Sequence, residues 1–572
     1  MLSRIRFIGL TFLFLMIALL GRLFFWQVIK GKSLAAQAQA QHLEGQNITA
    51  NRGNILADDE SWLAASYETW VVYASGPELT QSAREIANKL APFLADDEED
   101  KESETELQVA MRVEGLLEDR ESYWIPLKRR VPTEIKKNIE ALGIEGIRFE
   151  RHEARIYPEG SSSAHLLGFV GKDNEGVDTG YFGLEGYYDL VLAGRSGFRE
   201  RESNPLGVPI LIGSNKQVDA QYGVNLVTNI DKGIQMLVEE KLKKGLETYG
   251  ALDGTVIVMN PRTGAIMAMA SFPNYDPETY YDFKSEDYTN PAISKAFEPG
   301  SVFKPIVMAA GLDAGVVEPD TKCDICGEPL KVDKYFIKTW NNEYHKDTTM
   351  TEVIVHSDNV GMAYVGQKLG ADKLYDYLDN FGFGRLTNID LQGEANPKMR
   401  DRGTWNIVDT ATATFGQGIA ITPIQMIKAI SIIANDGVEV TPQIVDKLKL
   451  EGWEQDIEPV YGRRVISQKA ADEITQMMVQ AASDGEAKWA AIKGFDIAGK
   501  TGTAQIPVQG HYDEEKTIAS FVGFAPSHDP KFAMLVTMRE PQTSQWASET
   551  AAPLWFGIAN DLFPYLGIHP DD

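Results

Sequence analysis

The sequence predicts an α+β protein that begins with a membrane-anchoring helix. An apolar run spans residues 7–26, two apolar stretches at 255–259 and 265–270 flank a turn at 260–264, and a helical pattern fills much of 361–380. Apolar stretches on either side of a turn indicate paired strands, and apolar residues at helical spacing indicate a helix. Because the strand signals come in neighbouring pairs, the sheet of the C-terminal half is expected to be largely antiparallel.

Length and composition favour a folded protein of several domains. The chain has 572 residues, and a prior of roughly 100 to 200 residues per domain gives two to four domains. Hydrophobic residues make up 43% and charged residues 24%, as in ordinary globular proteins. The net charge of -27 argues against a nucleic-acid partner, which requires clustered Lys and Arg.

The N-terminal apolar run is long enough to span a bilayer. Residues 7–26 give about 20 positions, or roughly 30 Å of helix, and Arg22 is the one charged residue among them. Arg4 and Arg6 precede the run. Because positive residues stay on the cytoplasmic side, we expect a cytoplasmic N-terminus and an extracytoplasmic remainder, in a single-pass protein of the inner or plasma membrane.

A cleaved signal peptide is the alternative interpretation of this run. Small residues that resemble a cleavage site follow it, at Ala36, Ala38 and Ala40. The run is longer than the usual apolar core of a signal peptide, and Arg22 can extend to the interface. An uncleaved anchor is therefore favoured.

The remainder of the chain divides near residue 224. Residues 203–225 mix Pro, Gly, Ser and Asn and are interpreted as a linker between domains. Beyond them Asp231 is expected to cap a helix. Apolar runs beginning at Thr517 and Lys531 predict a second strand pair, and 423–435 has a helical pattern.

One tetrapeptide has the residue types of a nucleophile and its base. Ser301 and Lys304 form the chain's S-x-x-K sequence, which follows a turn and opens an apolar run typical of a buried helix. On a helix, residues three apart share a face, so the Lys304 amine would lie beside the Ser301 hydroxyl. A lysine can take the serine proton when burial or a second cation lowers its pKa.

Two further short sequences complete a pattern. An S-D-N sequence at 357–359 ends a predicted helix, where a hydroxyl and a carboxamide would project into a cleft. A K-T-G-T sequence at 500–503 lies in a predicted strand, in which Gly502 would allow the backbone of a ligand to approach closely. In this order the three sequences are the motif set of β-lactamases and penicillin-binding proteins.

The chain resembles a class B penicillin-binding protein, a monofunctional peptidoglycan D,D-transpeptidase. The resemblance covers most of the chain and rests on the anchor and on the segments RGNIL at Arg52, RIYPEGSSSAHLLGFVG at Arg155, GLEGYYDLVLAGRSG at Gly183, EPGSVFKP at Glu298, FGQGIAITPIQM at Phe415 and AGKTGTA at Ala498. It implies a cytoplasmic tip and transmembrane anchor at 1–30, and an elongated, β-rich pedestal of the dimerisation type at 31–223. Residues 224–572 would form a transpeptidase domain like that of serine β-lactamases, with a largely antiparallel sheet flanked by helices.

The resemblance also assigns expected roles to the motif residues. Ser301 would attack the penultimate D-Ala carbonyl of a stem peptide, and Lys304 would take its proton. Ser357 and Asn359 would relay the proton and position the substrate. Lys500 would add positive charge and help to lower the pKa of Lys304.

The same strand is expected to bind the substrate. Thr501 and Thr503 would hold the terminal carboxylate, with Gly502 between them, and the donor peptide would lie beside residues 500–506 as an added strand. Backbone N–H groups of Ser301 and Thr503 would form the oxyanion hole. No metal or cofactor is implied.

Implied partners are stem peptides ending in D-Ala-D-Ala, β-lactams, a membrane-embedded glycosyltransferase and a division or elongation complex. The segments beginning at Gly183 and Phe415 are more similar to the division type. Where many family members have another residue, this chain has Asp358, which is expected to change local polarity rather than the reaction.

Other functions remain open from the residues alone. A D,D-carboxypeptidase or serine β-lactamase passes the acyl group to water, but about two hundred extra residues, a retained anchor and no E-x-x-L-N-type motif argue against it. A non-catalytic scaffold disagrees with intact Ser301, Lys304 and Lys500, and a β-lactam sensor is disfavoured because a single N-terminal anchor with no sizeable cytoplasmic portion would leave it without an output module. Cys323 and Cys326 lack the second pair of a zinc ribbon, and outside the cytoplasm a disulfide is favoured over free thiols.

Overall fold

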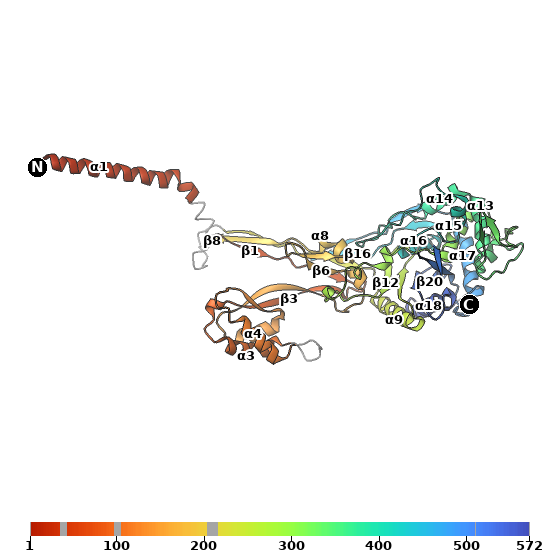
Figure 1. Ribbon diagram of the computed structural model, residues 1–572, viewed down its shortest axis with the longest axis horizontal. Coiled ribbons are helices and arrows are strands. Elements are labelled where there is room, and N and C mark those ends of the chain that lie inside the picture. The colour runs from red at the N-terminus through yellow and green to blue at the C-terminus, as the bar shows by residue number, and fades with distance from the viewer. Residues whose placement is uncertain (1, 35–42, 96–103, 203–214, 509–510, 571–572) are drawn as a thin grey trace. The chain divides into compact units, whose positions relative to one another are not determined.

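The computed structural model describes residues 2–34, 43–95, 104–202, 215–508 and 511–570 (Figure 1). Its contacts divide the chain into two units. The first contains Met1–Arg52 and Ala193–Gly223, and the second contains Gly53–Leu192 and Val224–Asp572. The domain boundaries expected from the sequence, after residues 30 and 223, stay predictions.

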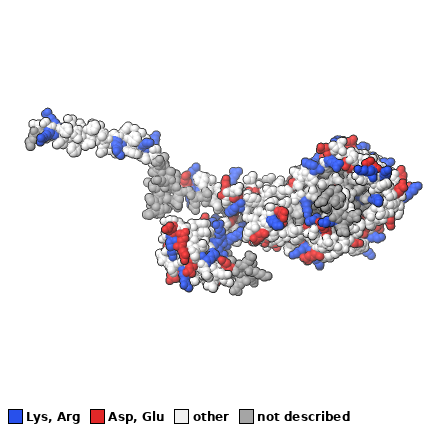
Figure 2. All heavy atoms as spheres, viewed as in Figure 1, with Lys and Arg blue, Asp and Glu red and all other residues white. Residues whose placement is uncertain are grey.

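The first unit contains the apolar helix. Helix α1 (Leu2–Phe24) continues into a π-helical turn, η1 (Phe25–Ile29), and these 28 residues are long and apolar enough to cross a membrane. Figure 2 shows them largely without charge in the middle and with basic side chains towards both ends. They fit a single-pass membrane protein. The unit also has an antiparallel sheet, ordered β1-β8-β9, of β1 (Leu43–Ile48), β8 (Gly197–Glu202) and β9 (Asn215–Val218).

The predicted linker at 203–225 contains strands where the structure describes it. Residues 203–214 lie outside the described residues, but Asn215–Val218 form β9, which pairs with β8. Asn225 begins β10 (Asn225–Thr228), in which Leu226 pairs in parallel with Ile55 of β2. This long-range pairing has no local signal in the sequence.

The second unit holds a sheet ordered β17-β16-β10-β2-β3-β4, with β5 also paired to β3. Its strands are β2 (Ile55–Leu56), β3 (Trp62–Ala74), β4 (Ile125–Pro132), β5 (Ile147–Ile156), β10, β16 (Val445–Leu450) and β17 (Trp453–Asp456). Three helices pack with β3, β4 and β5 around a separate apolar core: α3 (Ala83–Leu94), α4 (Glu106–Leu116) and α5 (Thr133–Ala141). Capping boxes begin α3 and α4.

Short elements follow β5. They are α6 (Ala164–Leu167), β6 (Phe169–Lys172), β7 (Asp178–Tyr181), α7 (Gly183–Tyr187) and α8 (Asp189–Leu192). Phe169 stacks on Tyr280 at a centroid distance of 4.2 Å, so an aromatic cluster joins this segment to the C-terminal part of the unit.

A second sheet of five antiparallel strands organises the C-terminal part. Its order is β12-β11-β21-β20-β19, formed by β11 (Asp253–Met259), β12 (Ile266–Phe272), β19 (Ala498–Val508), β20 (His511–Ala525) and β21 (Phe532–Arg539). The two predicted strand pairs and their antiparallel sense are confirmed. Strand β19 lies at the edge of this sheet.

Both faces of this sheet are covered by helices (Figure 1). In β21, Met534 and Val536 pack with α9 (Lys232–Tyr249) and α18 (Ala551–Tyr565), whereas Ala533 and Leu535 face the larger core. This alternation follows from the two-residue period of a strand. Asp231 caps α9 by accepting a hydrogen bond from the Ile234 N–H, as predicted.

The larger core contains the remaining helices, among them those predicted at 361–380 and 423–435. They are α10 (Pro291–Ser294), α11 (Lys304–Asp313), α12 (Met350–Val355), α13 (Asn359–Leu369), α14 (Ala371–Asn380), α15 (Ile407–Ala413), α16 (Pro423–Ala434) and α17 (Gln468–Asp484). Two small antiparallel sheets pair β13 (Leu330–Val332) with β14 (Tyr335–Ile337) and β15 (Val438–Val440) with β18 (Tyr461–Arg464). Helix α11 is buried from Lys304 to Leu312 and lies in the centre of this core.

Candidate active site

Ser301 lies on a tight turn that leads into the central helix. Residues Gly300–Phe303 form the 3-10 turn η4, and the α-helix begins at Lys304 rather than at Ser301 as predicted. Short 3-10 turns are common at helix N-termini. Gly300 has φ of +60°, and its N–H donates to the Gly416 carbonyl at 3.0 Å. Ser301 is half-buried, so its hydroxyl borders the surface while the helix behind it is fixed by packing.

Lys304 is a buried lysine. Its side chain has no exposed surface, and burial, followed by the nearby charge of Lys500, lowers its pKa to about 7. Its ammonium donates to the carbonyl oxygen of Ser357 and, at 3.2 Å, to the Ser357 hydroxyl. A neutral amine is therefore accessible near physiological pH beside a hydroxyl that can pass a proton.

The S-D-N sequence joins two helices. Ser357 adopts a left-handed conformation, with φ of +57°, between α12 and α13. Asp358 is the N-cap of α13, and its carboxylate accepts hydrogen bonds from the N–H groups of Val360 and Gly361. The Asn359 amide donates to the Lys338 carbonyl at 2.9 Å. Asp358 thus shapes the turn that presents Ser357 and Asn359.

The K-T-G-T sequence lies on the edge strand β19. Lys500 is buried, and burial lowers its pKa, although the charge of Glu486 acts in the opposite direction. The Lys500 ammonium donates to both the carbonyl and the hydroxyl oxygen of Thr501, each at 3.2 Å. The Thr503 hydroxyl accepts a hydrogen bond from the Ala547 N–H at 3.0 Å.

Gly502 permits close contact between this strand and the turn of Ser301. A Cβ atom at Gly502 would lie 2.8 Å from the Val302 nitrogen and 3.2 Å from the Pro299 carbonyl oxygen. The sequence predicted that a ligand backbone would use this space. The structure shows the Ser301 turn of the same chain at that distance, so Gly502 brings the strand against this turn, and the approach of a ligand backbone stays a prediction.

One cleft brings the three motifs together. Its lining includes Gly300, Ser301, Trp340, Ser357, Asn359, Phe415, Gln417, Glu486, Thr501, Gly502, Thr503 and Trp546. Lys304 and Lys500 are buried and bond to Ser357 and Thr501, which line it. Trp340, Trp546 and Glu486 lie outside every segment that the sequence singled out, and the two tryptophan ring centroids are 5.4 Å apart. None belongs to a motif, so no local signal identified them.

Cys323 and Cys326 form a disulfide in the structure. Both residues are fully buried, and the Cys323 N–H donates to the Thr348 carbonyl at 2.8 Å. The disulfide closes a short loop in the segment between the first two motifs.

Comparison with known proteins identifies the family. The model of the penicillin-binding protein transpeptidase domain matches residues 254–563, and that of the penicillin-binding protein dimerisation domain matches 47–228. The chain belongs to the penicillin-binding protein transpeptidase family. With both domains it is a class B penicillin-binding protein, as the sequence predicted.

Relatives of similar length support this assignment. This chain is 30% identical to Stage V sporulation protein D of Bacillus subtilis strain 168, over 99% of this chain and 86% of that protein. It is 29% identical to the peptidoglycan D,D-transpeptidase FtsI of Escherichia coli K12, over 97% and 90%. Its fold is similar to that of Penicillin Binding Protein 2X from Streptococcus thermophilus, with a TM-score of 0.78, 23% identity and coverage of 92% and 81%.

Proposed function

We propose that this penicillin-binding protein is a peptidoglycan D,D-transpeptidase that cross-links stem peptides through an acyl-Ser301 intermediate and is inhibited by β-lactams. The observation that carries the proposal is the single cleft lined by Ser301, Ser357 and the K-T-G-T strand, with the amine of Lys304 buried beside Ser357. The Lys304 pKa of about 7 suits a group that must both accept and return a proton near neutral pH.

Residues of all three motifs contribute to acylation. The Ser301 hydroxyl oxygen attacks the penultimate D-Ala carbonyl while its proton passes to Lys304. The C–N bond to the terminal D-Ala then breaks, and that amine leaves with the proton, which returns from Lys304 through the Ser357 hydroxyl. Asn359 positions the donor peptide. The N–H groups of Ser301 and Thr503 stabilise the oxyanion.

Deacylation repeats these steps with an amine from a second stem peptide. The acceptor amine attacks the ester carbonyl, loses a proton to Lys304, and Ser301 leaves as a hydroxyl. Before acylation, Thr501 and Thr503 bind the terminal carboxylate of the donor, which leaves with the terminal D-Ala. The edge position of β19 supports this arrangement, because an unpaired edge can accept the donor peptide as an added strand.

The setting of this reaction is the outer side of a membrane. Arg4 and Arg6 precede the apolar helix, so the positive-inside rule places the N-terminus in the cytoplasm and the catalytic domain outside. The transpeptidase requires glycan strands. We assign the synthesis of these strands to a membrane-embedded glycosyltransferase partner within a division complex. The similarity to FtsI supports the division assignment over elongation.

Intact-mass spectrometry tests the proposed function. The full-length chain in detergent is incubated with benzylpenicillin beside the Ser301→Ala variant. A stable adduct of one penicillin mass, absent from the variant, is the expected result. Rapid drug hydrolysis without a lasting adduct would indicate a β-lactamase, and no reaction would indicate a non-catalytic scaffold.

A further inference from the structure

Glu486 extends into the catalytic cleft from outside the three motifs. It follows helix α17, which ends at Asp484, and Gly485 packs tightly on the end of α12, where an added Cβ atom would lie 2.9 Å from the Val355 carbonyl oxygen. This packing holds the start of the loop. The Glu486 side chain is half-buried and lines the cleft that holds Ser301.

The Glu486 carboxylate is bonded to the hydroxyl of Thr501. The Thr501 hydroxyl oxygen accepts from the Lys500 ammonium at 3.2 Å and donates its proton to the Glu486 carboxylate at 2.8 Å. A threonine hydroxyl has one proton and can donate one hydrogen bond. While Glu486 accepts that bond, Thr501 has no proton to offer to another carboxylate.

The hydrogen bond from Thr501 to Glu486 competes with the proposed binding of the donor's terminal carboxylate by Thr501. We infer that Glu486 is a specificity-determining residue whose carboxylate competes with the donor's terminal carboxylate for the Thr501 hydroxyl. The inference rests on the proposed function, in which Thr501 binds that carboxylate. A donor must displace Glu486, because the donor and Glu486 carboxylates cannot share one hydroxyl proton. The two negative charges would also repel each other beside the same hydroxyl.

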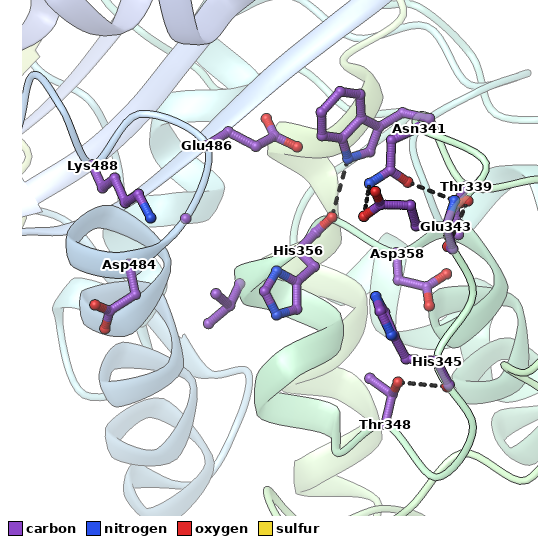
Figure 3. Close-up of a pocket in the computed structure, with 13 residues that line it drawn as sticks. Thr339, Asn341, Glu343, His345, Thr348, His356, Asp358, Asp484, Glu486 and Lys488 are labelled. Carbon is purple, nitrogen blue, oxygen red and sulfur yellow. Dashed lines mark hydrogen bonds between the residues drawn. The ribbon is translucent and has the colours of Figure 1, made fainter.

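A second pocket offers the displaced side chain a new position. Glu486 and Trp340 line both this pocket and the catalytic cleft. Figure 3 shows Glu486 and Lys488 on the same loop, with the Glu486 carboxylate directed away from the Lys488 ammonium. Rotation of the Glu486 side chain towards Lys488 would replace its hydrogen bond with the Thr501 hydroxyl by an ion pair with the Lys488 ammonium. We assign the donor-bound position of Glu486 to this pocket.

The competition is measured with two forms of one β-lactam. Benzylpenicillin carries a carboxylate, and its methyl ester does not, so only the acid requires Glu486 to move. Second-order rate constants for acylation of the full-length chain are compared for the unaltered protein and for Glu486→Gln. Loss of the Glu486 charge also acts on the pKa of Lys304, but this effect is common to the acid and the ester. We therefore expect the variant to raise the ratio of the acid rate to the ester rate about tenfold, the factor that corresponds to one hydrogen bond to a charged group.

Asp484→Asn is the matched control. Asp484 lines the second pocket but not the catalytic cleft, so neutralising it removes the same charge without releasing Thr501. We expect its ratio of acid to ester rates to equal that of the unaltered protein. Equal changes of the acid and ester rates in Glu486→Gln, or a lower ratio of the acid rate to the ester rate, would overturn the inference. Absence of any Ser301 adduct in the unaltered protein would instead overturn the proposed function.

Lys488→Met tests the displaced position. If Lys488 stabilises the rotated carboxylate, its loss slows acylation by the acid several-fold in the unaltered background and has no effect in the Glu486→Gln background. The same slowing in both backgrounds would show that the displaced Glu486 does not use Lys488.

Discussion

The ammonium of Lys304 donates to Ser357 twice, to its carbonyl oxygen and, at 3.2 Å, to its hydroxyl oxygen. The backbone of Ser357 is left-handed, with φ of +57°. Such a conformation is unfavourable for a residue other than glycine and persists where the surrounding structure enforces it. Here the two helices on either side of Ser357 enforce it, and the result is a defined path between the buried amine and the cleft.

The pH dependence of acylation follows from the pKa of Lys304. Burial and the charge of Lys500 lower this pKa to about 7, so the amine is protonated and inactive as a base below pH 7 and neutral above it. The acylation rate with benzylpenicillin should therefore rise with pH, with a midpoint near 7. Stopped-flow measurements between pH 5 and about 9 test this expectation, which a rate independent of pH through this range would contradict.

Lys500→Met should move this midpoint. Lys500 is the second cause of the low pKa of Lys304, and removing its charge raises that pKa. The residual acylation of the variant should rise with pH around a midpoint above that of the unaltered protein. An unchanged midpoint together with a lower maximal rate would show that Lys500 acts on the substrate alone.

Gly502→Ala should impair acylation through the Ser301 turn. The added methyl group would lie 2.8 Å from the Val302 nitrogen, a distance that requires the strand and the turn to separate. Because a misplacement of reacting groups by about 1 Å can cost 100-fold, we expect acylation to slow by about 100-fold. Gly557→Ala, where an added Cβ atom meets nothing within 4 Å, is the matched control and should keep the normal rate.

Local patterns predicted those parts of the structure that depend on near neighbours in the sequence. The hairpin of β11 and β12, the Asp231 cap and the three motifs all follow from short segments whose chemistry is self-contained. The contact of Glu486 with Thr501 depends on how α17 packs against α12, and the pairing of Leu226 with Ile55 joins distant segments. Neither has a local signal.

The motif residues themselves were only partly understood from the sequence. Gly502 was expected to allow a ligand backbone to approach, and the structure adds that it also allows the Ser301 turn to approach, because the pattern shows that room is needed and not what fills it. Asp358 was considered for its polarity, whereas the structure also shows it as the cap of α13. Both roles require the backbone path, which a short motif does not specify.

Asp358 should influence both stability and pH dependence, and two substitutions separate these effects. Asp358→Ala removes the cap of α13 and should lower the free energy of unfolding by about 1 kcal/mol. Asp358→Asn keeps an oxygen acceptor and removes the charge, which otherwise raises the pKa of Lys304. We therefore expect normal stability for Asp358→Asn but an acylation midpoint at lower pH. Thermal denaturation and the pH profile measure the two effects, and a large loss of stability in Asp358→Asn would contradict this division.

A buried ion pair should hold the segment before the short helices in place. The Arg155 guanidinium and the Glu185 carboxylate are 2.7 Å apart, with side chains 6% and 0% exposed. Arg155 also donates to the Gly53 carbonyl and the Ser66 hydroxyl. Glu185→Gln would leave the buried cation without its counter-charge, and we expect it to lower the free energy of unfolding by about 3 to 5 kcal/mol.

The surface pair of Arg148 and Glu78 is the control for this prediction. Its atoms are 2.6 Å apart, but the side chains are 53% and 43% exposed. Water and salt screen an exposed pair, so Glu78→Gln should cost less than about 1 kcal/mol. Urea denaturation of both variants, followed by tryptophan fluorescence, gives the comparison. Equal costs for the two substitutions would mean that the burial of Arg155 does not determine the strength of its ion pair, since the two pairs differ mainly in exposure.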